Sequence, residues 1–358
     1  MKKILIALLA FLWVSTGMFA QPANSPRRDF WTADDPVFSV IATNGKIYLG
    51  GSFSAIGFGA AGGTTLSAEM GTPDLEMPTV TGTLNAAVSD GAGGWFVGGS
   101  FTAVGGTARN NLAHIRSDRT VTTSFNPNVN GPVHTLLLAG NVLYAGGAFT
   151  RFGVGAVAAP RTNLAALNPA SGAVLALAPN PTGPVHALAS FGSRLFIGGA
   201  FNQISSESRT NLAAIDAVTG AVTDWDPRPV GRVNAMAYAN DELIVGGSFS
   251  AISGVARLNL AKVDPFTDTV SAWAPNPDGP VHAVLRAGSR IYVGGTFTNI
   301  ASQPRRGFAS LDPATGQNGF DFGVDGEVRT MASNGSRLFV GGAIHTFRRQ
   351  PAFQRGGD

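Results

Sequence analysis

The stretch LFIGGAF, residues 195–201, is an apolar run that ends in two glycines, a small residue and phenylalanine. Close variants of it recur along the whole chain, with intervals of 48, 48, 52, 48, 48 and 47 residues between successive first glycines. Those first glycines are Gly50, Gly98, Gly146, Gly198, Gly246, Gly294 and Gly341. Chance does not produce this regularity, so an internal repeat decides the architecture.

Each repeat contains four short apolar segments separated by turn residues. In the unit from Gly183 to Pro229 these segments are residues 183–188, 195–199, 209–215 and 221–225. Their length and their glycine, serine and aspartate punctuation predict strands, and no helical period competes with them. Four strands in about 48 residues are typical of a propeller blade, and a β-helix coil is shorter. The sequence therefore predicts an all-β fold, a seven-bladed β-propeller of four-stranded blades.

The recurring glycines and aromatics suggest how the blades pack. Glycine allows close backbone approach and a positive φ at a bulge. The phenylalanine after the glycines should supply apolar area between neighbouring blades. Its copies are Phe53, Phe101, Phe149, Phe201, Phe249 and Phe297, and the fourth segment adds Phe125, Trp225 and Trp273.

The two ends of the repeat array are incomplete in complementary ways. Asp29-Phe30-Trp31 resembles a fourth strand standing alone, and the last repeat provides its first two strands through Ile344. We therefore expect one propeller domain over residues 29–346, with the last blade closed by both chain ends. Residues 21–28 and 347–358 are predicted to be tails.

Residues 1–20 have the pattern of a signal peptide. Lys2 and Lys3 precede an apolar run over residues 4–14, and Ala20 offers a cleavage site. A membrane span needs about 20 apolar residues, more than this run contains. We expect a secreted, periplasmic or cell-surface protein without a membrane span after cleavage. With no cysteine, the chain forms no disulfide and has no thiolate chemistry.

Charge excludes one class of partner. The chain has 25 basic and 22 acidic residues, and removal of Lys2 and Lys3 leaves 23 against 22. This balance is not the electrostatic footprint of a nucleic-acid-binding protein. The expected partner is a protein or a glycan, and the expected state is a monomer.

Three segments carry a resemblance to a known family. IYVGGTFTNI (291–300), RGFASLDPATG (306–316) and APNPDGPVHAV (274–284) are similar to the delta-60 repeat β-propellers. The resemblance implies a bacterial, exported propeller from a family whose members mostly lack an assigned activity. The first repeat departs from the pattern between residues 60 and 82.

Histidine offers the first candidate chemistry. His134, His186 and His282 each follow Gly-Pro-Val in their repeats, and three imidazoles can bind zinc. Equivalent positions in a ring are rotated from blade to blade and need not converge, so a structural role is favoured over a metal site. The other repeats hold Phe38, Asn85, Asn234 and Arg329 at this position. No metal and no cofactor is predicted.

Carboxylates offer the second candidate chemistry. Glycosidases need two carboxyl groups across one bond. Asp216, Asp264 and Asp312 recur in a turn that aspartate caps, and Asp224 and Asp226 are expected to form a solvated edge. The weak candidates for ligand binding are off the repeat and could hold a cation through their oxygens: Glu69, Asp74 and Glu76. The alternative is a tolerant surface loop that only connects strands.

A repeated Arg-x-Asn-Leu-Ala motif offers the third candidate chemistry. Its arginines could bind a polyanion. Alternatively each could hydrogen-bond to loop carbonyls or stack on a neighbouring aromatic, and repetition in register favours this structural role. These arginines are Arg109, Arg161, Arg209 and Arg257. No catalytic motif and no catalytic residue is identified. The predicted function is a non-catalytic binding or scaffold module for a protein or cell-surface glycan. The alternative is a carbohydrate-active enzyme with its site at the axial end of the ring.

Overall fold

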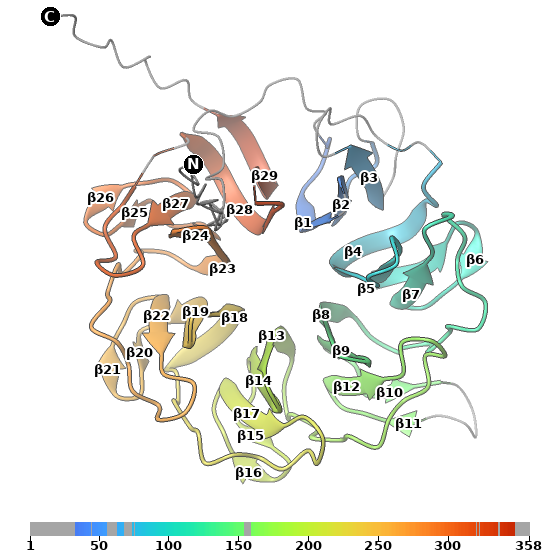
Figure 1. Ribbon diagram of the computed structural model, residues 1–358, viewed down its shortest axis with the longest axis horizontal. Coiled ribbons are helices and arrows are strands. Elements are labelled where there is room, and N and C mark those ends of the chain that lie inside the picture. Colours follow the sequence, from blue (N-terminus) through green and yellow to red (C-terminus); the bar gives the residue numbers. More distant parts are fainter. Residues whose placement is uncertain are drawn as a thin grey trace, which may run out of the picture.

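The computed structural model describes residues 33–43, 45–55, 63–67, 74, 76–153, 159–319, 321, 323–335 and 337–347. Within these ranges the secondary structure is β throughout, as the sequence predicts. None of the described segments is a helix long and apolar enough to cross a membrane. The antiparallel sheets follow one another around a ring in sequence order (Figure 1).

Each sheet is built on a hairpin whose first strand lies nearest the centre of the ring (Figure 1). These inner strands are β1 (Val37–Thr43), β4 (Val80–Ser89), β8 (Val133–Ala139), β13 (Val185–Phe191), β18 (Gly231–Ala239), β23 (Val281–Ala287) and β28 (Val324–Ser333). Their hairpin partners are β2 (Lys46–Gly51), β5 (Trp95–Val104), β9 (Val142–Gly147), β14 (Arg194–Gly199), β19 (Glu242–Phe249), β24 (Arg290–Gly295) and β29 (Leu338–Phe347). Among the described residues a third strand follows in all but the last sheet, as β3 (Gly63–Ser67), β7 (Leu112–Ile115), β12 (Leu164–Leu167), β17 (Leu212–Asp216), β22 (Leu260–Val263) and β27 (Phe308–Leu311).

The expected fourth strands are reduced to single bridges. Val222 bridges Ile215, and Val270 bridges Val263, but no longer ladder forms. The residues that follow are rich in proline, which cannot donate to a ladder, so the pairing stops after one step. In the five repeats where the structure describes this segment, the prediction of a full fourth strand was therefore wrong.

The loop between the second and third segments contains a small ribbon that the sequence did not suggest. In one repeat β15 (Gln203–Ile204) pairs with β16 (Glu207–Ser208) across a two-residue turn. The turn residues Ser205 and Ser206 have φ of 49° and 70°, as a tight hairpin turn requires. The matching ribbons are β10 (Arg151–Phe152) with β11 (Ala159–Pro160), β20 (Ala251–Ile252) with β21 (Val255–Ala256), β25 (Asn299–Ile300) with β26 (Gln303–Pro304), and β6 (Thr107–Ala108) on β5.

The double glycine allows the paired strand and the next sheet to approach its backbone closely. A Cβ on Gly198 would lie 2.6 Å from Cγ1 of Val233 in the next sheet, and a Cβ on Gly199 would overlap the carbonyl oxygen of Pro184 in its own sheet. The described glycines with positive φ, such as Gly192, lie outside this motif. Close approach is thus confirmed, and the positive φ that glycine also allows is not adopted at the double glycine.

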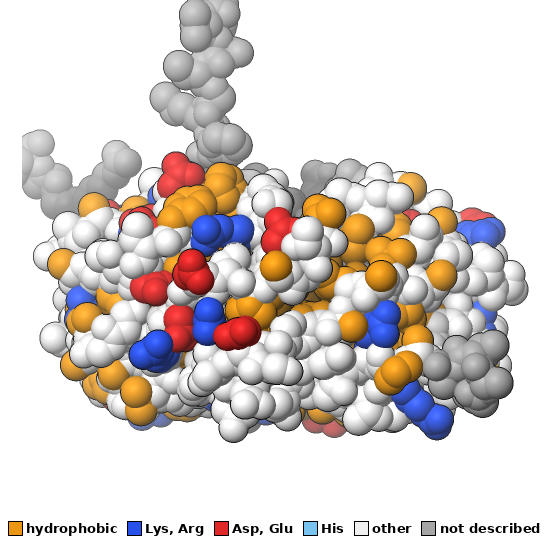
Figure 2. All heavy atoms as spheres, turned by 90° about the horizontal axis from the view of Figure 1, so that it is seen from below, with side chains coloured by type: hydrophobic (Ala, Val, Ile, Leu, Met, Phe, Trp, Pro, Cys, Tyr) orange, Lys and Arg blue, Asp and Glu red, His pale blue; other side chains and the backbone are white. Residues whose placement is uncertain are grey.

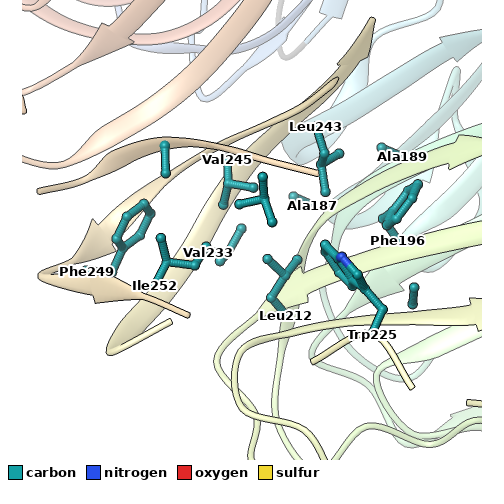
Figure 3. Close-up of a cluster of buried hydrophobic side chains, with 13 residues drawn as sticks. Ala187, Ala189, Phe196, Leu212, Trp225, Val233, Leu243, Val245, Phe249 and Ile252 are labelled. Atoms are coloured by element: carbon teal, nitrogen blue, oxygen red, sulfur yellow. The ribbon is translucent and has the colours of Figure 1, made fainter. Parts of the chain in front are cut away.

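The core lies between adjacent sheets. Figure 3 shows Phe196, Leu212 and Trp225 of one sheet in one buried cluster with Leu243 and Val245 of the next. The motif phenylalanines are all buried, at 1 to 4% exposure, which confirms their predicted place. The indole Nε1 of Trp225 also donates to the Asp264 carbonyl across this boundary, at 2.8 Å.

The first and last sheets are in contact. Val40 N on β1 donates to Thr330 Oγ1 on β28 at 3.1 Å, and a Cβ on Gly341 would lie 2.7 Å from Cγ1 of Val37. Ala332 joins the buried cluster of Val37 and Val40. The segment Asp29–Trp31 lies outside the described residues, so its expected role in closure stays a prediction.

Candidate functional site

Every inner strand carries a β-bulge at the same place in the repeat. In β13, Val185 pairs with Gly199 and Ala187 pairs with Gly198, so His186 is the extra residue between them. The other inner strands bulge at the equivalent position. The bulged residues, which we call the axial ring, are Phe38, Asn85, His134, His186, Asn234, His282 and Arg329. All of them are half-buried, and each follows a buried valine or leucine.

Members of the axial ring contact one another from sheet to sheet. The imidazoles of His134 and His186 lie 5.1 Å apart, centre to centre. The Arg329 guanidinium carbon lies 4.7 Å from the centre of the Phe38 ring, a cation–π contact that joins the last sheet to the first. These contacts show that bulged residues of neighbouring inner strands meet at two of the boundaries between sheets.

The two asparagines anchor their bulges to the next strand. The Asn85 side-chain amide donates to the Val133 carbonyl at 3.1 Å, and that of Asn234 donates to the Val281 carbonyl at 2.9 Å. Each carboxamide therefore donates one N–H to a backbone carbonyl and keeps its own oxygen as an acceptor.

One side of the ring carries charge. Most repeats have proline two residues before the bulged residue, but here the chain has Arg232 on β18 and Glu327 on β28. Glu327 Oε1 lies 3.2 Å from His282 Nε2, and Oε2 accepts from Arg329 at 2.7 Å. His282 therefore lies between an arginine-bearing strand and a glutamate-bearing strand.

The imidazoles of the ring are poor bases. Burial, helped by His134 and Arg232, lowers the pKa of His186 to about 4. Burial lowers the pKa of His134 as well, and it lowers that of His282 more than Glu327 raises it. All three are neutral at neutral pH, with lone pairs available as acceptors.

The three histidines do not share a centre. His134 and His186 are neighbours, whereas His282 is paired with Glu327 beyond the intervening strand β18. Among the described residues, no group of three or more histidine, aspartate or glutamate side chains could hold a metal ion. The arrangement offers stacking and hydrogen bonding to a ligand.

The predicted candidates Asp74 and Glu76 lie together beside an arginine. Arg119 Nε contacts Asp74 Oδ2 and its Nη1 contacts Glu76 Oε2, both at 2.8 Å. Glu69 lies outside the described residues. A ligand site made by these three residues stays a prediction, and Arg119 already neutralises part of its charge.

A polar cavity of about 590 Å³ lies between two adjacent sheets. Asp224, Asp226 and Asp268 line it together with Arg209 and Arg228. Asp224 is exposed, as expected of a solvated edge, whereas Asp226 is half-buried. The Asp226 amide donates to Asp268 Oδ1 at 3.0 Å, and burial followed by the Asp226 charge raises the Asp268 pKa. Figure 2 shows acidic and basic side chains intermixed on one edge of the ring.

His114 has hydrogen-bond partners that the sequence did not reveal. Its Nε2 lies 3.0 Å from Asp90 Oδ2 and its Nδ1 lies 2.8 Å from Thr122 Oγ1. This order of groups resembles a hydrolase triad. However, Thr122 is only 4% exposed and Phe96 stacks on the imidazole at 4.4 Å. The chain of hydrogen bonds therefore stabilises its sheet.

The repeated arginines hold the outer segments. Arg209 donates to the Thr223 carbonyl at 2.7 Å, and Arg257 donates to the Ser271 carbonyl at 2.7 Å. Their predicted role as donors to loop carbonyls is confirmed. The motif asparagines contribute a second tie, because Asn211 has a φ of 61° and its side chain donates to the Gly231 carbonyl at 2.9 Å. The recurrence of these asparagines at one position of the motif was the sequence signal for this structural role.

Comparison with known proteins supports the fold. No protein-family model and no curated protein matches the chain. Among solved structures, the WD40 β-propeller domain of Doa1 is similar, with a TM-score of 0.60 and 13% identity over 87% of this chain and 91% of that one. The computationally designed Ika8 protein is similar with a TM-score of 0.54 and 10% identity, over 86% of this chain and 94% of that one. At such identities the likeness shows the fold alone: this is an all-β protein with a β-propeller fold.

Proposed function

We propose that the chain is an exported, non-catalytic β-propeller that serves as a binding or scaffold module for a protein or cell-surface glycan. The axial ring is its contact surface. One observation carries the proposal: the repeats keep their packing residues but vary the bulged residue among phenylalanine, asparagine, histidine and arginine. A repeat that keeps its packing residues and varies a bulged position on its inner strands has the pattern of a ligand surface on a fixed scaffold.

The proposal includes a particular ring. The hairpins from β1–β2 to β28–β29 would be the blades of a seven-bladed propeller of the delta-60 repeat type, and Asp29–Trp31 would complete the last blade. Contact between β1 and β28 supports this closure. Similarity to a WD40 domain supports a role in binding, since propellers commonly serve as scaffolds. The signal-peptide pattern of residues 1–20 supports export.

The enzymatic alternative needs two carboxylates free to act on a sugar. In the described part of the axial ring region, Glu327 has both oxygens engaged, by His282 and by Arg329. The polar cavity contains aspartates, but its described lining has no aromatic side chain to hold a sugar ring. Binding without turnover is therefore the function that the geometry favours.

Thermal shift against a panel of neutral and acidic polysaccharides and envelope proteins tests the proposal. The ring variant is the double substitution His134→Asn and His186→Asn, which uses the residue that two repeats already have there. The control is Arg151→Gln, on an exposed ribbon residue. We expect a ligand to raise the melting temperature of wild type and control but not of the ring variant, with no product released. New reducing ends, or an equal shift in the ring variant, would overturn the proposal.

A further inference from the structure

We infer that the axial ring binds a sugar acid, and that the guanidinium of Arg232 receives the carboxylate of a uronic-acid unit in an oligosaccharide. The inference deepens the proposed function and rests on it. It assigns a substrate class to the charged side of the ring, where β18, β23 and β28 lie side by side (Figure 1).

Arg232 is the cation available to a ligand. Its side chain is exposed, and it has no hydrogen bond or ion pair with the described residues. It lies two positions before Asn234 on β18, between the strands of His186 and His282. It influences both of their imidazoles electrostatically. Arginine presents two parallel N–H donors to a carboxylate, so an unpaired guanidinium beside neutral imidazoles suits a single carboxylate.

The other ring groups suit hydroxyls and a sugar ring. Asn85 and Asn234 retain carboxamide oxygens, and Glu327 has further lone pairs. The neighbouring imidazoles of His134 and His186 offer planar faces against which a pyranose ring can pack. Acceptors, planar faces and the exposed guanidinium of Arg232 together match the groups of a hydroxylated ring acid.

The same groups disfavour other anions. Glu327 would repel a polyphosphate or a densely sulfated chain at close range. A peptide that binds as an added strand needs a regular free sheet edge, and the bulge on every inner strand interrupts that edge. These features favour a sugar acid over an acidic peptide.

Bound carboxylate should also change proton uptake. The charged and titratable groups around the ligand are Arg232 on β18, His134 on β8, His186 on β13, His282 on β23, and Glu327 with Arg329 on β28. A ligand anion favours the protonated imidazoles. Affinity should therefore rise as pH falls from 7.5 to 5, where the uronate itself is still ionised.

Isothermal titration calorimetry of the purified chain tests the inference. The probes are tetramers of galacturonate and of mannuronate, their methyl esters, a neutral glucose tetramer and a glutamate-rich peptide. We expect at least one uronate tetramer to bind, its methyl ester to bind at least tenfold more weakly, and Arg232→Gln to weaken the acid at least tenfold. Arg151→Gln should bind like wild type, and circular dichroism should show all variants folded.

The outcomes separate the two proposals. Equal binding of acid and ester, or an unchanged Arg232→Gln, overturns the inference. Binding of the peptide or the neutral sugar alone, abolished by His134→Asn with His186→Asn, overturns the inference and leaves the proposed function standing. If no probe here and no member of the wider polysaccharide and protein panel binds, both proposals fail.

Discussion

At the residue scale, the repeated arginine is a brace for the outer segment of its sheet. Arg109 is 6% exposed, and its guanidinium donates to the carbonyls of Ala108 at 2.7 Å and Thr122 at 2.9 Å. We predict that Arg109→Ala lowers the free energy of unfolding by about 2 to 3 kcal/mol, because buried carbonyls lose their donors. Urea titration measures this. The exposed Arg151→Ala should change it by less than about 0.5 kcal/mol, and equal effects would contradict the brace.

The histidines of the ring give stability a pH dependence at the same scale. The folded pKa of His186 is about 4, whereas an unfolded histidine titrates near about 6.5. As pH falls through this window the unfolded chain takes up a proton that the folded chain refuses, so stability present above about pH 6.5 is lost toward pH 4. We predict that His186→Asn flattens this decline by at most about 1.4 kcal/mol per pH unit, the limit for one proton. Melting curves from pH 4 to 7.5 would show it, and parallel declines would refute it.

At the element scale, the bulge and the double glycine act together, because each requires the other in the hairpin. Gly198 and Gly199 pair with Ala187 and Val185 on either side of the bulged His186, and their missing side chains leave room for the inner strand. We predict that Gly199→Ala costs at least about 2 kcal/mol, because its Cβ would overlap backbone. Gly192→Ala, in an open turn with a φ of 55°, should cost about 1 kcal/mol from backbone strain alone. Urea titrations rank the two, and the reverse order would refute the account.

The element scale also shows what the sequence could predict. The glycine spacing predicted the hairpins and their order, since spacing and turn residues are local properties. The spacing did not reveal the bulges. The double glycine leaves room for the bulged strand that pairs with it across the hairpin, and this pairing is not a local property of the sequence. Nor did the glycine spacing predict that Arg232 lies near His186 and His282, or that Asp268 lies near Asp226. These contacts depend on how adjacent sheets pack. The pairing of His114 with Asp90 and Thr122 lies within one sheet, and it was hidden because it depends on how the strands of that sheet align.

At the scale of the whole molecule, stability depends on whether the ring is closed. Boundaries between sheets share buried clusters, and the boundary of β1 with β28 has the hydrogen bond from Val40 to Thr330. A ring loses more than one local contact when a boundary opens, because each sheet buries its faces against two neighbours. If Asp29–Trp31 completes the last sheet, its aromatics should then matter to the whole ring.

We therefore predict that Phe30→Ser with Trp31→Ser lowers the free energy of unfolding by at least about 3 kcal/mol, the usual cost of removing buried aromatics. Thermal and urea unfolding followed by circular dichroism measure this. Arg27→Gln with Arg28→Gln, in the predicted tail just before the segment, should leave the unfolding curve unchanged. An unchanged curve in the aromatic variant would mean that both chain ends do not close the ring. The contact of β1 with β28 would then have to hold the first and last sheets together alone.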